Sequence, residues 1–297
     1  MSPSFAVWLF GLVARLPLAA LHRIGVFLGW VTYRVSAKYA ERLRANFEYA
    51  CADHPQKKLL LNDSVGEAGK ALIELPWVWC RPLAQVMATV KVCAGWELVE
   101  AARAQGKGLL FLTPHMGCFE VSGLYIAERM PITVLYRPPR LAWLEQVMRK
   151  GRERSQMRLA RTDMSGVRLL FKALKRGEAI GLLPDQVPGA GEGEWAQFFG
   201  RPAYTMTLVG RLLESTGAIA LMIYVERLPR GEGYVIRFTA LDFVPSVPIT
   251  QQINAALEKV VRACPAQYLW SYNRYKIPAG MEPPESHTKM KQAGGET

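Results

Sequence analysis

Apolar residues follow three different patterns along the 297-residue chain. Residues 2–33 are largely apolar, and two Arg and one His are their only basic residues. Across residues 36–79, apolar positions recur every three or four residues, which predicts a helical region. Beyond residue 82, short apolar runs alternate with amphipathic segments. This alternation of strands and helices predicts an α/β fold with a mixed sheet flanked by helices.

The same alternation locates the individual elements. The expected strands are residues 86–92, 108–113, 132–136, 179–183, 218–225 and 234–238. The expected helices are residues 96–105, 119–129, 141–154, 167–175, 205–215 and 249–263. We expect an N-terminal segment over residues 1–35 and one domain over residues 36–277. Residues 278–297 are rich in Pro, Gly, Lys and Glu, so we expect a disordered tail there.

The N-terminal apolar segment allows two interpretations. Its longest uncharged run, residues 1–14, is shorter than the roughly 17–25 residues that span a bilayer. A signal peptide is not expected, because no Lys or Arg precedes the apolar run and no clear cleavage site follows it. The segment is either a buried helical hairpin bent at Pro17 or a membrane anchor, spanning the bilayer or lying in its interface.

The residues in and after this segment favour the membrane. Aromatic residues typical of membrane interfaces occur at Trp8, Phe10, Phe27, Trp30 and Tyr33. The cations Arg34, Lys38, Arg42 and Arg44 follow at once, as in a cytoplasmic flank beside anionic lipid. The sequence therefore predicts a membrane-associating N-terminal segment, without deciding between spanning and lying flat.

Composition narrows the class of protein and the kind of partner. With 50% hydrophobic and 21% charged residues, the chain has the composition of a folded protein. Five cysteines, with no Cys-x-x-Cys pair, argue against a disulfide framework or a zinc ribbon and suit a reducing compartment. The net charge of +12 indicates a negatively charged partner.

The positive charge is concentrated in a basic segment, residues 137–176. It holds 12 Lys and Arg against three acidic residues, whereas residues 177–200 contain no Lys or Arg at all. Solvated faces of amphipathic helices account for part of this pattern. Nucleic-acid binding is not expected, because the segment has only two aromatic residues, Trp143 and Phe171, and no known binding motif. Of these two, Phe171 falls on the apolar face of its predicted helix. An acidic protein or a phosphorylated lipid suits the basic segment better.

One of the four histidines stands out as a candidate for catalysis. Fingerprints of dinucleotide, nucleoside triphosphate, zinc protease and serine hydrolase sites are absent from the sequence. His115 follows an apolar run, and Glu120 comes five residues later. A histidine at the carboxyl end of a strand lies where α/β sheets bind ligands, and Gly117 allows close backbone approach. His115 as proton acceptor, oriented by Glu120, is a candidate general-base site.

Two other predicted strands also end in polar residues. Asp185 and Gln186 close the run AIGLLPDQ, and Arg137 closes the run ITVLYRP. Such a carboxylate can bind a polar substrate, orient a basic group or cap its loop. Together with His115, these strand ends predict one polar cleft at the edge of the sheet.

These residues belong to a series of motifs that resembles the late acyltransferases of lipid A biosynthesis. This is the lauroyl/myristoyl family, within the lysophospholipid acyltransferase superfamily. The motifs, in chain order, are His-x4-Glu at His115 and Glu120, Tyr-Arg-Pro at 136–138, Gly-Arg-x-Arg at 151–154, Pro-Asp-Gln at 184–186, Phe-Phe-Gly-x-Pro-Ala-x-Thr at 198–205 and Gln-Tyr-Leu-Trp-x3-Arg-Tyr-Lys at 267–276. The likeness extends from about Trp8 to Lys276 and is specific because the motifs occur in order. Met116, Gly117 and Cys118 stand where the family usually has small polar or aromatic residues.

The resemblance implies a reaction and a location. It implies a fold like that of glycerol-phosphate acyltransferases, with the catalytic domain on the cytoplasmic face of the inner membrane. The enzyme would move a fatty acyl chain from acyl carrier protein to the 3-hydroxyl of an acyl group on a lipid A precursor. Transfer would be direct, within a ternary complex, without a covalent enzyme intermediate.

The resemblance also assigns roles to the candidate residues. His115 would be the general base and Glu120 its partner; Arg137, Arg152, Asp185 and Gln186 would bind substrate and organise the cleft. The basic segment would dock the carrier protein or lipid phosphates. Acyl carrier protein would serve as co-substrate, with no metal and no other cofactor, and a monomer is the expected state.

Three other functions are compatible with the sequence. The same residues could acylate another acceptor, such as a lysophospholipid, an ornithine lipid or a mannosylated glycolipid. The chain could also be a non-catalytic basic protein that binds membranes or RNA. A soluble hydrolase is the third alternative, in which water replaces the acceptor hydroxyl.

Overall fold

A seven-stranded sheet forms the centre of the protein in a computed structural model that describes residues 3–284. The strand order is β1-β9-β8-β2-β5-β3-β4, and all neighbours are parallel except the antiparallel pair β8 and β9. The strands are β1 (Val90–Ala94), β2 (Leu109–Leu112), β3 (Ile132–Tyr136), β4 (Met157–Arg161), β5 (Ala179–Leu182), β8 (Ile219–Arg227) and β9 (Tyr234–Ala240). A separate antiparallel hairpin consists of β6 (Gly193–Phe198) and β7 (Arg201–Met206).

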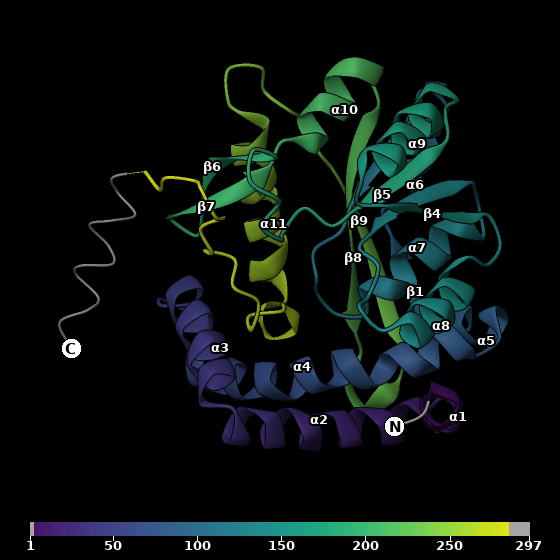
Figure 1. Ribbon diagram of the computed structural model, residues 1–297, viewed down its shortest axis with the longest axis vertical. Coiled ribbons are helices and arrows are strands. Elements are labelled where there is room, and N and C mark those ends of the chain that lie inside the picture. Colours follow the sequence, from purple (N-terminus) through teal and green to yellow (C-terminus); the bar gives the residue numbers. More distant parts are fainter. Residues whose placement is uncertain (1–2, 285–297) are drawn as a thin grey trace.

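Helices cover both faces of the sheet, and further helices lie below the ends of its central strands (Figure 1). One face packs against α6 (Trp96–Arg103), α7 (Phe119–Ala127) and α8 (Ala142–Arg152), and the other against α9 (Met164–Lys175), α10 (Leu208–Thr216) and α11 (Ile249–Ala263). The N-terminal helices are α1 (Pro3–Val13), α2 (Leu18–Val35), α3 (Ala37–Ala50), α4 (Lys57–Cys80) and the short α5 (Leu83–Met87). Helices α2 and α4 run side by side below the carboxyl ends of the central strands (Figure 1). The predicted α/β architecture with a mixed sheet is confirmed.

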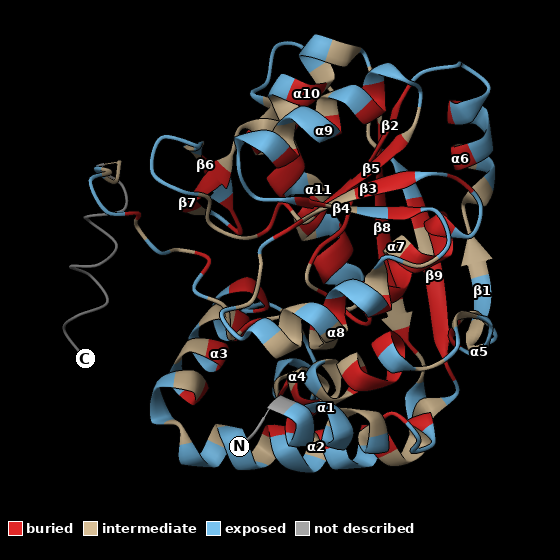
Figure 2. Ribbon diagram, turned by 45° about the vertical axis from the view of Figure 1, so that its right-hand side comes forward, coloured by how far each residue is buried: buried red, intermediate tan, exposed pale blue. Residues whose placement is uncertain are grey.

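The central strands separate two hydrophobic cores. Along β2, Leu109 and Phe111 pack into the core on the α7 side, whereas Leu110 and Leu112 pack into the core on the α9 side. Successive side chains of a strand point to opposite faces, so a strand covered on both faces must be apolar throughout. The central strands are accordingly buried along their length, while the outer surfaces of the helices are exposed (Figure 2).

The structure corrects three local predictions. Strand β4 was not expected, because it is an edge strand whose Arg158 and Arg161 point to solvent. The β6–β7 hairpin was also missed; it turns through Phe199 and Gly200, both with positive φ, as a tight hairpin requires. The expected strand at 86–92 starts later, because residues 83–87 form α5.

The N-terminal segment is a helical pair bent at Pro17. Within residues 3–284 no single helix is long and apolar enough to cross a membrane. The helices Ser4–Val13 and Leu18–Val35 reach the required length and hydropathy only as a pair, and the pair is bent by 117°. Its inner side contributes Leu18 and Leu21 to the core. Its outer side exposes the apolar residues Phe5, Val7, Trp8, Leu9, Leu12, Leu16, Ile24, Phe27, Leu28, Val31 and Val35. We call these residues the apolar face; membrane association stays a prediction.

Helices α2 and α4 meet with their backbones almost in contact. A Cβ at Gly29 would lie 2.2 Å from the carbonyl oxygen of Val65, and one at Gly69 would lie 1.9 Å from that of Gly25. Small residues spaced four apart allow this approach, as they do between helices in membranes. The contact fixes α2 on α4 in one register.

This contact predicts that Gly29→Ala destabilises the protein. The methyl group has no space, so the free energy of unfolding should fall by about 1–3 kcal/mol, as for other overpacked sites. Gly210→Ala in α10 is the matched control, because the nearest atom to its added Cβ is 3.5 Å away. Denaturant unfolding in mild detergent measures both variants. Equal stability of the two would contradict the proposed contact.

Candidate active site

His115 and Asp185 meet at the carboxyl edge of the sheet. Strands β2 and β5 are neighbours, so the loops that follow them lie side by side. The backbone N–H of His115 donates to Asp185 Oδ2 at 2.8 Å, and His115 Nδ1 lies 2.7 Å from Asp185 Oδ1. Asp185 is only 2% exposed, whereas the imidazole is half-buried. The predicted meeting of these two strand ends is confirmed.

The contacts of the imidazole determine its tautomer. A carboxylate can only accept, so Nδ1 carries the proton that points at Asp185. Nε2 of the neutral ring is then an acceptor, and the Gln186 side-chain amide nitrogen lies 3.1 Å from it. His115 is therefore held as a base with its lone pair on Nε2, and Gln186 occupies the place of a proton donor.

The charge on Asp185 is stabilised from two sides. Burial raises the pKa of Asp185, but the His115 ring and backbone N–H, together with the Arg274 guanidinium, hold it below its usual value. Arg274 is buried too, and donates to the Tyr204 carbonyl at 2.7 Å and the Thr205 hydroxyl at 2.7 Å. The carboxylate behind His115 is thus ionised.

Glu120 does not contact the imidazole through the hydrogen bond expected from the sequence. It lies in the first turn of α7, where Arg152 of α8 pairs with both of its oxygens and Trp79 Nε1 donates to Oε2 at 3.0 Å. Burial raises the pKa of Glu120, but Arg152 and Trp79 outweigh this, so its pKa is lowered. The orienting contact belongs to Asp185, because a helix begins between His115 and Glu120 and turns Glu120 towards α8.

The Arg137 side chain lies at the surface of the protein. It follows β3 as predicted, at the same edge of the sheet, but its side chain is exposed to solvent. Arg152, in contrast, is half-buried and paired with Glu120, with its guanidinium over the Trp79 ring. The structure therefore unites His115, Asp185 and Gln186, sets Glu120 and Arg152 together nearby, and leaves Arg137 at the surface.

The loop between His115 and α7 is fixed at each peptide. Gly117 has φ of +54°, and a Cβ there would lie 1.7 Å from the Val225 carbonyl oxygen. Its N–H donates to the Gln267 carbonyl at 3.0 Å, and the Cys118 N–H donates to Val225 at 3.2 Å. The His115 carbonyl accepts from Leu269 N–H at 3.0 Å. His115 is therefore presented by a rigid loop.

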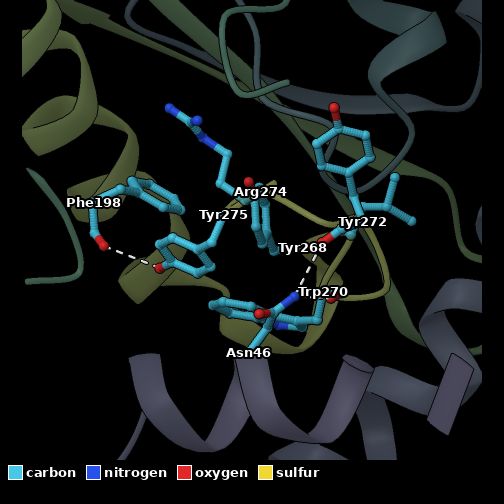
Figure 3. A pocket seen from close by; sticks show the side chains of 8 residues that line it. Asn46, Phe198, Tyr268, Trp270, Tyr272, Arg274 and Tyr275 are labelled. Carbon is cyan, nitrogen blue, oxygen red and sulfur yellow. Dashed lines mark hydrogen bonds between the residues drawn. The ribbon is translucent and has the colours of Figure 1, made fainter. Parts of the chain in front are cut away.

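A small aromatic pocket lies beside this loop (Figure 3). It has a volume of about 10 Å³ and is lined by Asn46, Phe198, Tyr268, Leu269, Trp270, Tyr272, Arg274 and Tyr275. A space of this size holds one water molecule at most, not an acyl chain. Asn46 closes it by donating to the carbonyls of Trp270 and Tyr272 at 2.8 and 3.0 Å. The pocket supports the loop rather than binding a lipid tail.

Cys118 is the cysteine nearest to His115 along the chain, and it is buried. Residues 3–284 contain no group of three or more His, Cys, Asp or Glu placed to hold a metal ion. Cys118 lies in the loop after His115, but burial raises the pKa of its thiol well above the usual value. A neutral, buried thiol is a poor nucleophile.

Three supporting residues were missed from the sequence. Trp79 bonds to Glu120 and Arg227 to the Gly117 carbonyl, whereas Arg274 acts on Asp185 by its charge; all three come from distant parts of the chain. Arg274 was noticed only as part of a motif. No local spacing identifies a buried arginine or tryptophan whose partner is far away in sequence, so only the fold identifies them.

A histidine–aspartate pair at the carboxyl edge of an α/β sheet is the arrangement of an acid–base enzyme. The comparisons with known proteins specify which kind. The family described as bacterial lipid A biosynthesis acyltransferase matches residues 3–277. The chain belongs to this family and is an acyltransferase enzyme, as its motifs predicted.

Individual relatives cover most of the chain. The lipid A biosynthesis lauroyltransferase of Escherichia coli (strain K12) is 26% identical over 275 residues, which cover 89% of this chain and 88% of the relative. The palmitoleoyltransferase of the same strain is also 26% identical, over 92% of this chain and 90% of its own length. A lipid A biosynthesis acyltransferase of Haemophilus influenzae is 26% identical over 59% of this chain and 56% of its own length.

The lowered carboxyl pKa values predict a loss of stability in acid. Asp185 and Glu120 bind protons less readily in the folded than in the unfolded state. Their contribution is complete above the ordinary carboxyl pKa, near 4, and is lost as the pH falls through the lower folded pKa values. The melting temperature should therefore decline below about pH 5. Asp185→Asn should lower the free energy of unfolding by about 1–3 kcal/mol at neutral pH. Its melting temperature should then decline less steeply in acid than that of the wild type. Parallel curves of melting temperature against pH would contradict this account.

Proposed function

We propose that this acyltransferase moves a fatty acyl chain from acyl carrier protein to the 3-hydroxyl of an acyl group on a lipid A precursor. The observation that carries the proposal is the tautomer of His115, because Asp185 holds the proton on Nδ1 and leaves Nε2 as the base. Membership of the family supplies the class of acceptor. The proposed donor and acceptor fit a direct transfer, because the reaction needs no nucleophile from the enzyme.

The proposed reaction moves one proton and exchanges one bond. The acceptor hydroxyl displaces the Gln186 amide from His115 Nε2 and gives its proton to that nitrogen. Its oxygen attacks the thioester carbonyl and forms the new ester bond, and the carbon–sulfur bond breaks. The imidazolium then returns the proton to the leaving thiolate. Asp185 stabilises the imidazolium, and Gln186 can turn its carbonyl oxygen towards the protonated Nε2.

Glu120 and Arg152 are proposed to act as a fixed ion pair beside the reacting atoms. The Arg152 charge and the hydrogen bonds from Arg152 and Trp79 hold the pKa of Glu120 below its usual value despite burial, so the pair stays charged. Arg152 and the first-turn N–H groups of α7 provide positive potential for the oxyanion of the tetrahedral intermediate. Glu120 thus contributes to catalysis by holding Arg152, rather than by orienting the imidazole.

The basic segment is proposed to receive the acidic carrier protein. Ten of its twelve basic side chains are exposed, namely Arg137, Arg140, Arg149, Lys150, Arg158, Arg161, Arg168, Lys172, Lys175 and Arg176. Arg152, one of the two that are not exposed, reaches the candidate site. Positive charge steers an acidic partner to a surface and speeds its encounter. Arg137, at the strand edge, would contact carrier-protein or lipid phosphate.

The apolar face is proposed to lie in the cytoplasmic leaflet of the inner membrane. Trp8 is 60% exposed and Phe27 is 67% exposed, and both belong to the helices that lie below the carboxyl edge of the sheet (Figure 1). Burying such side chains in lipid is favourable. A monomer would satisfy this arrangement, since the membrane would cover the apolar face.

The proposed reaction predicts a mass gain of one acyl chain. Purified protein in detergent is given a tetra-acylated lipid A precursor and carrier proteins loaded with 10- to 16-carbon chains, and mass spectrometry identifies the product. His115→Ala and Asp185→Asn should each lower the rate by at least about 100-fold, because general-base catalysis contributes about 10²–10⁴-fold. Val244→Ala, an exposed position on the β9–α11 connection, is the control.

Two results would overturn parts of this proposal. A fully active Asp185→Asn variant alongside an inactive, folded Glu120→Gln variant would return the orienting role to Glu120. Absence of product with every donor, from a folded wild type, would point to a different acceptor, tested next with lysophospholipid and ornithine lipid. Release of free fatty acid instead would indicate a hydrolase.

Membrane binding is predicted to depend on the apolar face. Trp8→Ser and Phe27→Ser should each weaken binding to anionic vesicles by about 10-fold or more, because each buried large side chain contributes about 1.5–3 kcal/mol. Val244→Ser is the matched control, since Val244 is 54% exposed but lies away from α1 and α2. Vesicle flotation measures the partition. Equal losses in all three variants would mean that the apolar face is not the membrane contact.

A further inference from the structure

A cluster of buried and half-buried polar residues lies behind the His115 loop and has no part in the proposed proton transfer. Its members come from α2, α4, β8 and β9, and they are His22, Glu67, Lys70, Glu74, Arg227 and Tyr234. Buried charges are retained at a cost in desolvation unless they are paired. The question is what this cluster holds in place.

Arg227 is the centre of the cluster. It is only 3% exposed and lies at the carboxyl end of β8, which is parallel to β2. Its Nε donates to both oxygens of Glu74, at 2.8 and 2.9 Å, and one terminal nitrogen donates to Glu67 at 2.6 Å. Both carboxylates come from α4, seven residues apart, so they share one side of the helix.

The other terminal nitrogen of Arg227 contacts the His115 loop. It donates to the carbonyl oxygen of Gly117 at 2.7 Å, two residues after His115. The backbone of Arg227 also bonds to the Gln267 side chain, at 2.8 and 2.9 Å, and the Gln267 carbonyl accepts the Gly117 N–H. The two peptide bonds of Gly117 are therefore both tied to groups around Arg227.

The other members of the cluster keep Arg227 in this place. Glu74 also accepts from the Tyr234 hydroxyl at 3.1 Å and contacts His22 Nε2 at 2.5 Å. Lys70 bonds Glu67 at 2.5 Å. Each of the three nitrogens of the Arg227 guanidinium has a fixed acceptor, so the planar group has one orientation. A lysine, with one terminal nitrogen, could not make the same set of bonds.

We propose that Arg227 is a positioning residue for the acyl transfer, which fixes the Gly117 peptide and thereby the place of His115 against Asp185. This inference rests on the proposed function of His115, but it concerns a residue that touches neither substrate nor the reacting atoms. It explains why two carboxylates and a guanidinium are buried beneath the loop, where apolar residues would pack at lower cost.

The test compares Arg227→Lys with Lys70→Met in the full-length protein. Arg227→Lys keeps the charge that Glu74 needs but cannot hold Glu74, Glu67 and Gly117 together. Lys70→Met removes one ion pair from the same cluster, at Glu67, and keeps the bonds from Arg227 to Glu74 and Gly117. Three quantities are measured: melting temperature, hydrogen exchange of the amides of residues 115–118, and kcat and KM with dodecanoyl carrier protein and tetra-acylated precursor.

Positioning predicts a specific combination of results. In Arg227→Lys, kcat should fall by about 10–100-fold while KM changes by less than about threefold, and loop exchange should accelerate. Lys70→Met should change the melting temperature little and leave kcat and loop exchange unchanged, because the bonds from Arg227 to Glu74 and Gly117 remain. If Arg227→Lys does not fold, Glu67→Gln replaces it, because Glu67 lies at the more accessible end of the cluster, and a smaller change of the same kind is expected.

The opposite results would overturn the inference. Unchanged kcat in a folded Arg227→Lys variant, or an equal fall of kcat in Lys70→Met, would reduce the cluster to a stabilising role. Hydrogen exchange separates this failure from failure of the proposed function. An inactive wild type with faster loop exchange in Arg227→Lys would refute the acceptor and donor assignment, while the link from Arg227 to the loop would stand.

Discussion

The close approach of the Gly117 backbone to Val225 is the constraint on which the site depends. The loop after β2 has to lie flat against β8, and only a residue without a side chain fits there. This approach brings His115, just before the glycine, to the end of β5, and starts α7 just after it. One backbone contact thus separates the two halves of the site: the imidazole on the sheet edge and Glu120 in the helix.

Each half of the site centres on a buried carboxylate with its own cationic support. His115 and Asp185 are backed by Arg274, and Glu120 is held by Arg152 and Trp79. A buried charge without a partner is unfavourable, so each carboxylate depends on its cation to remain ionised. Fixed charges of this kind need no reorganisation when the reaction moves a proton, which is the source of much enzymatic rate enhancement. The fold supplies them from four different elements.

The sequence predicted the sheet and the first half of the site well because both depend on local patterns. Buried strands are continuous apolar runs, and polar residues directly after them mark the sheet edge, which identified His115, Asp185 and Gln186. Glu120 was given the wrong contact, because its spacing from His115 does not reveal that a helix starts between them. The edge strand β4 and the β6–β7 hairpin were missed, because exposed arginines and a glycine turn interrupt their patterns. Arg227 was missed because its partners on α4 precede it by more than 150 residues.

The glycine contact between α2 and α4 has a consequence for the environment in which the protein folds. Most helix pairs in water-soluble proteins hold together because their contact excludes water, and that driving force disappears in lipid. Backbones in direct contact attract each other by dispersion instead, which does not depend on the solvent. The α2–α4 pair is therefore able to keep the same geometry whether the outer side of α2 faces water or acyl chains. The shape of this helix pair would then be the same before and after any contact of α2 with lipid.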